Sequence, residues 1–560
     1  MIERELRTLV REAIAQAARA GELTTSESPI FDVTQPQRRE HGDWTTNAAL
    51  VLQKLESKPP RKIAEAIVKH MPDRDWIRDV DIAGPGFINF HLSNVWLHQT
   101  AERALTLGPR FGSSDDGAAL SMNVEFVSAN PNGPLTVGHG RGAAVGDSIA
   151  RLLEFTGHKV TREYYFNDGG LQMELFGRSI AANYLQLLGR EAAVPEEGYH
   201  GDYVRAIAQE ILDEHGPAFS HLDPDELREQ MRELGYVKMR AWIERTLVRM
   251  RVSFDVWFNE GDLYTSGRVA ETIERLRNAG YIYEKDGAQW LSSERLGDSR
   301  DRVLVRSIGP KLPTYLAPDL AYHLDKAARG FDQMIDIFGA DHSGQVPSLE
   351  VTLPVLGVDR SRLEFIIVQF VRLLRSGEAV AMGTRSGQFV TVDELMDEVG
   401  VDATRYTYLQ TSVDHDVNFD IEEVKRQSME NPVYYVQYAH ARIASILKHA
   451  ADENVSEEGT IVWDELQHEA EIELMRTIAN FEESVLVAAR QRAPYRMTKY
   501  AEELARHFHR FYTECRVITP DANLTRARLA LARAAKQVLA NTLDLLGVSA
   551  PDRMDRDVVD

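Results

Sequence analysis

Cysteine is almost absent from this chain of 560 residues, which contains only Cys515. A single cysteine excludes a disulfide within the chain and a cysteine-rich zinc site, and it is typical of a reducing compartment. Long apolar runs are also missing. The N-terminal helical stretch carries Glu3, Glu5 and Glu12 among its apolar positions, and nothing resembles a signal peptide or a membrane span. We therefore expect a cytoplasmic protein with no membrane partner.

An excess of positive charge is lacking as well. Lys and Arg number 64 against 86 Asp and Glu, for a formal net charge of −22. This balance argues against a general coat on nucleic acid, but local basic patches could still serve specific recognition. With 43% hydrophobic and 27% charged residues, the composition is that of a globular protein long enough for several domains.

The most informative stretch of the sequence is 123–147. Alternating side chains predict a strand over 122–129, and Asn-Pro-Asn-Gly-Pro predicts a loop over 130–135. A glycine-rich helix then runs toward residue 156. The first turn of a helix has free N–H groups and the positive end of the helix dipole, so this arrangement predicts a nucleotide or anion site.

Two other interpretations of the glycine-rich stretch are open on the pattern alone. Gly138, Gly140 and Ala143 satisfy the dinucleotide fingerprint, with Glu163 placed to accept a ribose hydroxyl. The fit is poor, because the loop 130–137 separates the strand from the first glycine, which should follow it almost directly. A glycine-rich helix start with a capping role only is the third interpretation.

The same residues resemble a known family. Thr136-Val137-Gly138-His139 resembles the HIGH signature of class I aminoacyl-tRNA synthetases, and the flanking EFVSANPNGPL and YYFNDGGLQM resemble arginyl-tRNA synthetases. The resemblance implies that Thr136, Gly138 and His139 contact ATP. In the family the glycine lets adenine lie on the backbone, and the histidine donates to the phosphates as charge develops.

The resemblance extends over essentially the whole chain and implies a multidomain fold, α/β plus all-α. Later apolar runs predict further buried strands of a parallel sheet, and the stretch about 171–301 is too long for a loop. The predicted domains are an N-terminal additional α/β domain that binds the tRNA D-loop (1–116), a Rossmann-type catalytic domain (117–421) with an insertion (about 171–301) and a signature-loop and stem region (about 380–421), and a helical anticodon-binding bundle (422–560).

A pocket for free arginine must meet a guanidinium, which is always protonated and pairs best with planar carboxylates. Charge alone nominates Glu125 and Asp319, although Asp319 follows Pro318 at a helix start, where a carboxylate is favourable anyway. The resemblance assigns Tyr315 and Asp319 to the guanidinium. It places the other arginine contacts at Glu125, Ser128, Asn130 and, for the α-amino end, His342. No third ligand stands near Asp341 and His342, so no metal site is expected.

The second class I signature is altered. The family's Lys-Met-Ser-Lys-Arg loop falls on 381–385, where both lysines are missing. Members without this lysine often carry one at the position of Gly133, and Thr136 replaces the usual histidine. The resemblance assigns Met382 and Arg385 to the ATP site, and we hypothesise that Arg385 supports the departing pyrophosphate, which needs cation or Mg²⁺ support. Slow or lost activation is the alternative.

Two groups of side chains resemble tRNA contacts of the family. Phe87 and Asn89, in GPGF-x-N-F, would stack on and read a D-loop base; alternatively, Phe87 is core and Asn89 caps a turn. Tyr435 and Tyr438, in NPVYYVQYAHAR, would face the anticodon loop, with Met554 near the same site. An aromatic helix stripe in the core is the alternative for the tyrosines.

These observations predict ATP-dependent ligation of L-arginine to tRNA(Arg) through an arginyl-adenylate. ATP would act as its Mg²⁺ complex, with no tightly bound cofactor, and we expect a monomer. One alternative is a tRNA-binding paralogue with weakened or lost arginine activation. Another is a nicotinamide-dependent oxidoreductase built on the glycine fingerprint, which leaves the aromatic C-terminal helix unexplained.

Overall fold

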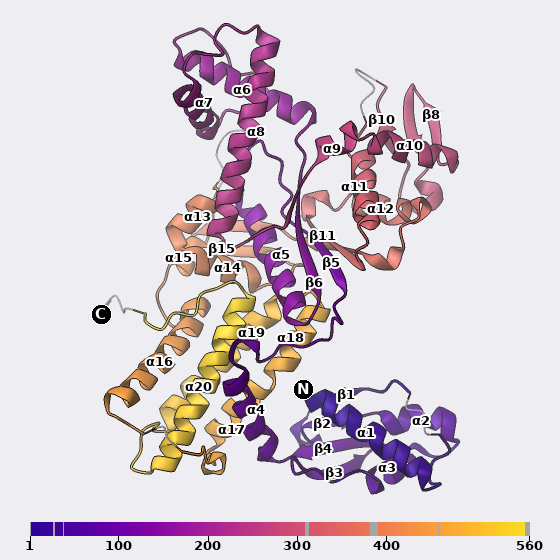
Figure 1. Ribbon diagram of the computed structural model, residues 1–560, viewed down its shortest axis with the longest axis vertical. Coiled ribbons are helices and arrows are strands. Elements are labelled where there is room, and N and C mark those ends of the chain that lie inside the picture. The colour runs from indigo at the N-terminus through magenta and orange to yellow at the C-terminus, as the bar shows by residue number, and fades with distance from the viewer. Residues whose placement is uncertain are drawn as a thin grey trace. The chain divides into compact units, whose positions relative to one another are not determined.

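The computed structural model describes residues 2–25, 29–36, 38–307, 313–380, 390–456 and 459–554. The chain forms two compact units, and each gathers segments that are far apart in the sequence (Figure 1). Unit 1 comprises Met1–Gly112, Ala439–Glu483 and Glu503–Leu539, and unit 2 comprises Ser113–Tyr438, Ser484–Glu502 and Ala540–Asp560. In the part of the chain that is described, no helix combines the length and the apolar character needed to cross a membrane.

The N-terminal part of unit 1 is a small α/β layer. Helix α1 (Ile2–Arg19) buries Leu6, Leu9, Val10 and Ile14, which recur at helical spacing along one face. The antiparallel sheet has the order β1-β2-β4-β3. After α1, the helices and strands of this N-terminal part are β1 (Val33–Thr34), β2 (Trp44–Thr46), α2 (Ala48–Glu56), α3 (Pro60–Lys69), β3 (Ile77–Ala83), β4 (Phe87–Leu92) and α4 (Asn94–Leu107).

The C-terminal region is helical, as predicted. Helix α16 begins at Pro432 directly after Asn431, whose Oδ1 accepts from the Val433 N–H at 3.2 Å. The asparagine cap and the proline at the first helical position explain why the helix starts here. The helices are α16 (Pro432–Asp452), α17 (Glu469–Ala479), α18 (Phe481–Arg490), α19 (Tyr495–Glu514) and α20 (Ala522–Leu545).

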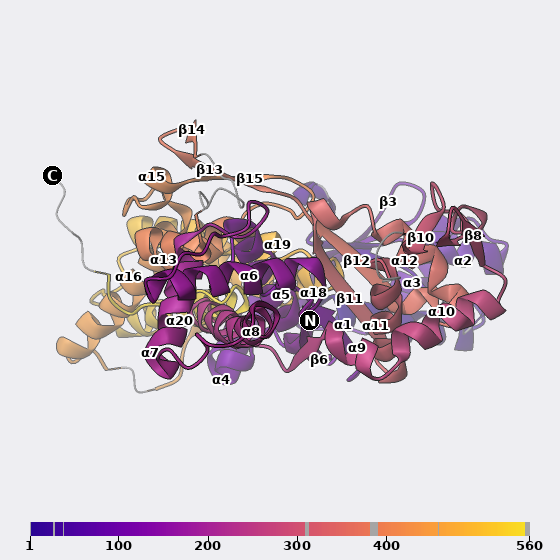
Figure 2. The same cartoon turned by 90° about the horizontal axis from the view of Figure 1, so that it is seen from above.

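Unit 2 contains a five-stranded sheet of order β12-β11-β5-β6-β7, and every neighbouring pair is parallel. The views in Figures 1 and 2 agree that α5 (Val137–Phe155) lies on one side of the strands and α11 (Leu316–Ala328) and α12 (Val346–Thr352) on the other. The strands are β5 (Ser121–Glu125), β6 (Lys159–Phe166), β7 (Val256–Asn259), β11 (Gln333–Gly339) and β12 (Leu363–Val368). Strand order reverses at β5, so the carboxyl end of β5 is where such a sheet binds its ligand.

Strand β5 is shorter than the predicted 122–129, because it ends at Glu125. The backbone then turns sharply: Val127 has φ of 69°, Ser128 has φ of 40°, and the Ser128 N–H donates to the Phe126 carbonyl at 3.0 Å. This is a strained γ-turn on a β-branched residue, which side-chain alternation cannot reveal. Such strain is found where the surroundings of a functional site enforce it.

The predicted insertion contains a strand of the main sheet. Helices α6 (Gly170–Leu187), α7 (Asp202–His215) and α8 (Pro224–Arg249) come first, and β7 then pairs with β6. A four-residue strand is too short to show a period in the sequence. The remainder is α9 (Glu260–Thr265), α10 (Arg268–Asn278) and an antiparallel sheet of β8 (Ile282–Lys285), β9 (Ala288–Leu291) and β10 (Arg302–Val305).

The segment after the main sheet returns to the start of α5. Its elements are β13 (Val371–Arg375), β14 (Glu378–Ala379), α13 (Val392–Val399), α14 (Val401–Leu409), β15 (Val417–Asp420) and α15 (Ile421–Val424). The Val392 N–H donates to the Leu135 carbonyl at 2.9 Å, and Thr136 bridges Thr391. The predicted ATP contacts Met382 and Arg385 lie outside the described residues.

Candidate active site

A buried ion network stands behind the carboxyl end of β5. Lys326 of α11 is fully buried and donates to both Glu125 and Asp336 of β11. His323 pairs with the other Asp336 oxygen at 2.9 Å, and the Ser128 hydroxyl donates to Glu125 at 2.8 Å. Burial lowers the pKa of Lys326, but the Asp336 and Glu125 carboxylates outweigh burial and hold this pKa above its usual range. The predicted residues Glu125 and Ser128 therefore meet, with Glu125 held from two sides.

Asp319 lies in the first turn of α11 and has no cation of its own. No described residue donates a side-chain or backbone hydrogen bond to its carboxylate. Burial raises its pKa to about 7, and the nearby carboxylates of Glu260 and Glu125 contribute to the increase. The pKa of Glu260 is also raised, chiefly by burial. An excess of negative charge in a partly buried space is what a guanidinium would neutralise.

Glu260 was not nominated by the sequence. It is the first residue of α9, directly after the short strand β7, and it is buried with Oε2 accepting from the Tyr165 hydroxyl at 2.7 Å. The pairing of β7 with β6 places Glu260 at the same edge of the sheet as Glu125, because the carboxyl ends of parallel strands meet there. The strand was too short to be found, and so Glu260 was missed.

Tyr315 stands immediately before α11, with 53% of its surface exposed. The pKa of Tyr264 is raised first by burial and then by the charges of Glu260, Asp319 and Tyr315, which therefore lie near its side chain. The Asp319 N–H donates to the Tyr315 carbonyl at 3.2 Å, so the exposed Tyr315 lies one helical turn before Asp319.

The loop after the γ-turn is held by the inserted helices. Asn130 and Asn132 both donate to the Gln172 side-chain oxygen, at 2.8 and 2.9 Å. The Asn132 amide also donates to the Tyr199 hydroxyl at 2.9 Å, and the Tyr203 hydroxyl donates to the Asn132 carbonyl at 2.9 Å. Asn130 is therefore oriented at the pocket rim by Gln172, at the start of α6.

Thr136 and His139 form a reciprocal cap at the start of α5. The Thr136 N–H donates to His139 Nδ1 at 3.2 Å, which leaves the ring proton on Nε2. Burial lowers the pKa of His139 to about 4, although Asp341 raises it; His342 lowers it further. At neutral pH His139 is therefore an uncharged donor through Nε2. The same charges place His139 close to the exposed His342, in the turn that follows β11.

Gly138 and Gly140 have different roles. Gly138 is exposed, and a Cβ added there would meet only the Thr136 hydroxyl, at 3.8 Å. A Cβ at Gly140 would lie 2.8 Å from a methyl of Val392 and 3.1 Å from the Tyr408 ring. Gly140 therefore permits the packing of α5 against α13 and α14. Of these two glycines, Gly138 leaves the backbone open to a ligand.

The dinucleotide interpretation is wrong on a second count. Glu163, its ribose acceptor, is fully buried and accepts hydrogen bonds from three side chains. Its donors are Asn123 at 2.6 Å, Arg329 at 2.7 Å and Tyr322 at 3.0 Å. A carboxylate engaged in this way has no room for a ribose.

The two predicted D-loop residues lie on β4. Phe87 is 39% exposed, so it is not core, and Asn89 lies within the strand, so it does not cap a turn. The Asn89 amide is buried and donates to Asp81 at 3.2 Å. Phe87 is available for stacking, whereas Asn89 would have to share its amide between Asp81 and a base.

The predicted anticodon residues are half-buried. Tyr435 and Tyr438 lie on α16 beside the buried Val436, and Met554 is also partly exposed. The ring of Tyr438 stacks on Tyr434, with centroids 6.1 Å apart. The aromatic side chains of α16 are therefore not all buried in the core.

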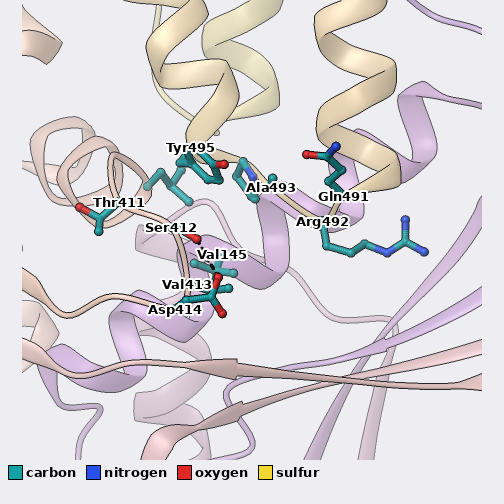
Figure 3. A pocket seen from close by; sticks show the side chains of 11 residues that line it. Val145, Thr411, Ser412, Val413, Asp414, Gln491, Arg492, Ala493 and Tyr495 are labelled. Atoms are coloured by element: carbon teal, nitrogen blue, oxygen red, sulfur yellow. Dashed lines mark hydrogen bonds between the residues drawn. The ribbon is translucent and has the colours of Figure 1, made fainter.

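A separate cavity lies away from all of these residues. Figure 3 shows it between Val145 of α5, the segment Thr411–Asp414, and the turn Gln491–Tyr495 that joins α18 to α19. None of the predicted site residues lines it. Glu125 and Glu260 instead lie at the carboxyl ends of β5 and β7 in the main sheet.

A parallel sheet that reverses order at β5, followed by a loop and the Thr-Val-Gly-His helix start, defines a nucleotide-binding domain of the class I aminoacyl-tRNA synthetases. Three family models match: "Arginyl tRNA synthetase N terminal domain" over 4–92, "tRNA synthetases class I (R), catalytic domain" over 113–439, and "DALR anticodon binding domain" over 436–554. The domain limits proposed from the sequence remain predictions.

Relatives agree with these matches. An arginine–tRNA ligase of Moorella thermoacetica is 44% identical over 557 residues, 99% of each chain, and one of Desulfosudis oleivorans is 45% identical over 555 residues, 98% of this chain and 99% of the relative. The arginyl-tRNA synthetase structure of Thermus thermophilus has a TM-score of 0.75 at 22% identity and covers 99% of this chain and all of that one, which shows the shared fold. The chain belongs to the arginyl-tRNA synthetase family.

Proposed function

We propose that this protein ligates L-arginine to tRNA(Arg) in two ATP-dependent steps at the carboxyl edge of the main sheet. The observation that carries the proposal is the Asp319 carboxylate, which accepts no hydrogen bond from the described residues and whose pKa is raised by burial and by the charges of Glu260 and Glu125. The guanidinium of arginine would supply the missing positive charge. The similarity to arginine–tRNA ligases over the whole chain supports the same substrate.

In the first step the arginine carboxylate attacks the α-phosphorus of ATP. A new P–O bond forms, the bond to pyrophosphate breaks, and arginyl-adenylate results. The neutral His139 would donate through Nε2 to a phosphate oxygen as charge develops there, so it needs no extra proton. In the second step a terminal ribose hydroxyl of tRNA, by class habit the 2′-hydroxyl, attacks the arginyl carbonyl and releases AMP.

We propose that the pocket holds arginine through Asp319, Glu260 and Tyr315 at the guanidinium end. Glu125, Ser128 and Asn130 would complete the contacts, with His342 at the α-amino end. Glu125 is already held by Lys326 and Ser128, so its remaining lone pairs face the substrate with little freedom to move. The work of such a site is positioning and charge complementarity, without a covalent enzyme intermediate.

Mg²⁺ carried by ATP would neutralise charge on the phosphates. The altered signature loop leaves Arg385 as the proposed protein cation near the pyrophosphate, together with Met382 at the nucleotide. Arg385→Ala should slow arginine activation. A rate within about threefold of the unchanged enzyme, well under 1 kcal/mol of barrier, would dismiss this role.

We propose a monomer, with Phe87 and Asn89 at the D-loop and Tyr435, Tyr438 and Met554 at the anticodon.

The direct test is formation of arginyl-tRNA from purified protein, ATP, tRNA(Arg) and labelled arginine. Citrulline, which has nearly the shape of arginine without its charge, and lysine, which has the charge without the planar fork, are the matched controls. We expect transfer of arginine and negligible transfer of both controls. Failure to charge tRNA with any of the three would contradict the proposed function and favour a tRNA-binding paralogue.

A further inference from the structure

Three arginines hold the end of helix α20. The last carbonyls of a helix have no partner within it and carry the negative end of the helix dipole. Here one carbonyl of the last turn and two carbonyls just after the helix accept from guanidinium groups that come from α5, α14 and the second residue after α8. The bonds are Arg151 to the Asp544 carbonyl at 3.2 Å, Arg405 to the Leu546 carbonyl at 3.0 Å, and Arg251 to the Gly547 carbonyl at 2.9 Å.

Arg405 connects the end of α20 to helix α5, which begins with the Thr-Val-Gly-His motif. It is fully buried, and its two terminal nitrogens donate to Asp147 of α5 at 2.6 Å and to the Met250 carbonyl at 2.7 Å. Gly547 has φ of 65°, and a Cβ there would lie 2.2 Å from the Arg405 guanidinium. The segment after α20 therefore packs closely against Arg405 of α14, which is itself bonded to α5.

Asp402, on the same helix as Arg405, completes the connection. One oxygen accepts from the Ser549 N–H at 3.1 Å, and the other accepts from the Gln437 amide at 2.9 Å and from the Ser549 hydroxyl. Arg251 also donates to Asp402. Gln437 in turn donates to the Ser549 carbonyl at 2.9 Å. One carboxylate thus binds both the start of α16 and the C-terminal segment.

The two segments are those that carry the proposed anticodon contacts. Gln437 lies between Tyr435 and Tyr438 on α16, and Ser549 lies five residues before Met554. An amide that could have read a base is therefore already committed to Asp402 and to Ser549. These bonds nevertheless anchor the stretch of α16 that carries the two tyrosines.

We propose that Asp402 is a positioning residue for anticodon recognition. Together with Arg405 and Arg251, it fixes the start of α16 and the segment 546–554 against each other and against α5. This inference rests on the proposed function, since it assumes that Tyr435, Tyr438 and Met554 meet the anticodon. Loss of the carboxylate lets the two segments shift independently. A misplacement of about 1 Å, even when its cause lies far from the reacting groups, can lower the rate about a hundredfold.

The test measures kcat/KM of arginylation with two transcripts, the cognate tRNA(Arg) and the same tRNA with one anticodon base changed. The unchanged enzyme should prefer the cognate transcript. In Asp402→Asn the ratio of the two values should fall at least fivefold, while KM for arginine stays within twofold. Ser549→Ala, which removes the hydroxyl bonds to Asp402 and Gln437 but keeps the carboxylate and the backbone bonds, should shift the ratio in the same direction by less.

Asp298→Asn is the matched control. Asp298 is also a buried carboxylate of unit 2, and it accepts from Arg302 at 2.9 Å and from Ser348 at 2.7 Å without touching α16 or the C-terminal segment. Its ratio should equal that of the unchanged enzyme.

A purely structural Asp402 would slow arginylation of both transcripts by the same factor and leave the ratio intact, which would overturn the inference. If Asp402→Asn does not fold, the Ser549→Ala ratio decides. The two proposals fail differently. An unchanged enzyme that makes no arginyl-tRNA defeats the proposed function, whereas one that charges and discriminates, with variants that keep the ratio, defeats only the positioning role.

Discussion

At the residue scale, Asp319 shows how a binding site opposes folding. Its carboxyl group is partly buried near two other carboxylates, and its pKa rises to about 7. A group whose pKa is higher in the folded than in the unfolded chain stabilises the fold least when it is ionised. The free energy of unfolding that depends on Asp319 is therefore retained below its unfolded pKa near 3.8 and is lost as pH rises through about 7.

Asp319→Asn should therefore make the protein more stable at pH 8 and less active. We expect the free energy of unfolding to increase by at least about 1 kcal/mol at pH 8 and by clearly less at pH 4.5, where the folded-state carboxyl is protonated. The kcat/KM for arginine should fall by at least about tenfold, because a charge-assisted hydrogen bond is lost. Urea unfolding at the two pH values checks the first effect. A variant that is less stable at pH 8 would contradict this account of the pocket.

Arginine binding should depend on pH for the same reason. Below pH 7 the Asp319 carboxyl holds a proton and cannot pair with the guanidinium, so binding must release that proton. KM for arginine should fall as pH rises from 6 to 8, by up to about tenfold per unit on the acid side. Calorimetry in buffers of different ionisation enthalpy would detect the released proton. In Asp319→Asn this part of the pH dependence should disappear.

At the element scale, helix α5 shows which parts of a motif serve packing. The sequence correctly predicted a strand, a loop and this helix in that order, although the strand ends four residues earlier than expected, because alternation, clustered breakers and glycines are local features. It could not separate the glycines from one another. Only the neighbouring α13 and α14 reveal that Gly140 touches Val392 and Tyr408 while Gly138 touches neither.

The two glycines should respond differently to alanine. Gly140→Ala should reduce the free energy of unfolding by about 1–3 kcal/mol, since the methyl group would overlap Val392 and Tyr408. Gly138→Ala should change stability by less than about 1 kcal/mol and raise KM for ATP. Thermal unfolding and ATP-dependent kinetics on both variants separate the effects. Equal loss of stability in the two variants would show that Gly138 is also a packing position.

The γ-turn at Val127 and the strand β7 are the elements that the sequence missed. Both depend on contacts between segments that are distant in the chain. The turn brings the Ser128 hydroxyl onto Glu125, and β7 brings Glu260 to the same edge through its pairing with β6. A β-branched residue with positive φ and a four-residue strand have no local signature in the sequence.

At the scale of the whole molecule, the order of domains and the parallel sheet followed from the sequence, whereas the connections between segments did not. Lys326 and Asp336 form the buried charge behind Glu125, yet they come from α11 and β11, about 200 residues further along the chain. Arg405 and Asp402 are similar: each bonds to residues near the C-terminus. Long-range charge pairing of this kind appears only once the chain is folded.

We expect this protein to activate arginine although the segment 381–385 lacks both lysines of the family signature. The most direct test is arginine-dependent exchange of labelled pyrophosphate into ATP, measured with and without tRNA(Arg). We expect exchange in the presence of tRNA, abolished when citrulline replaces arginine. Tight binding of tRNA(Arg) with no exchange under either condition would contradict the account and identify a tRNA-binding paralogue.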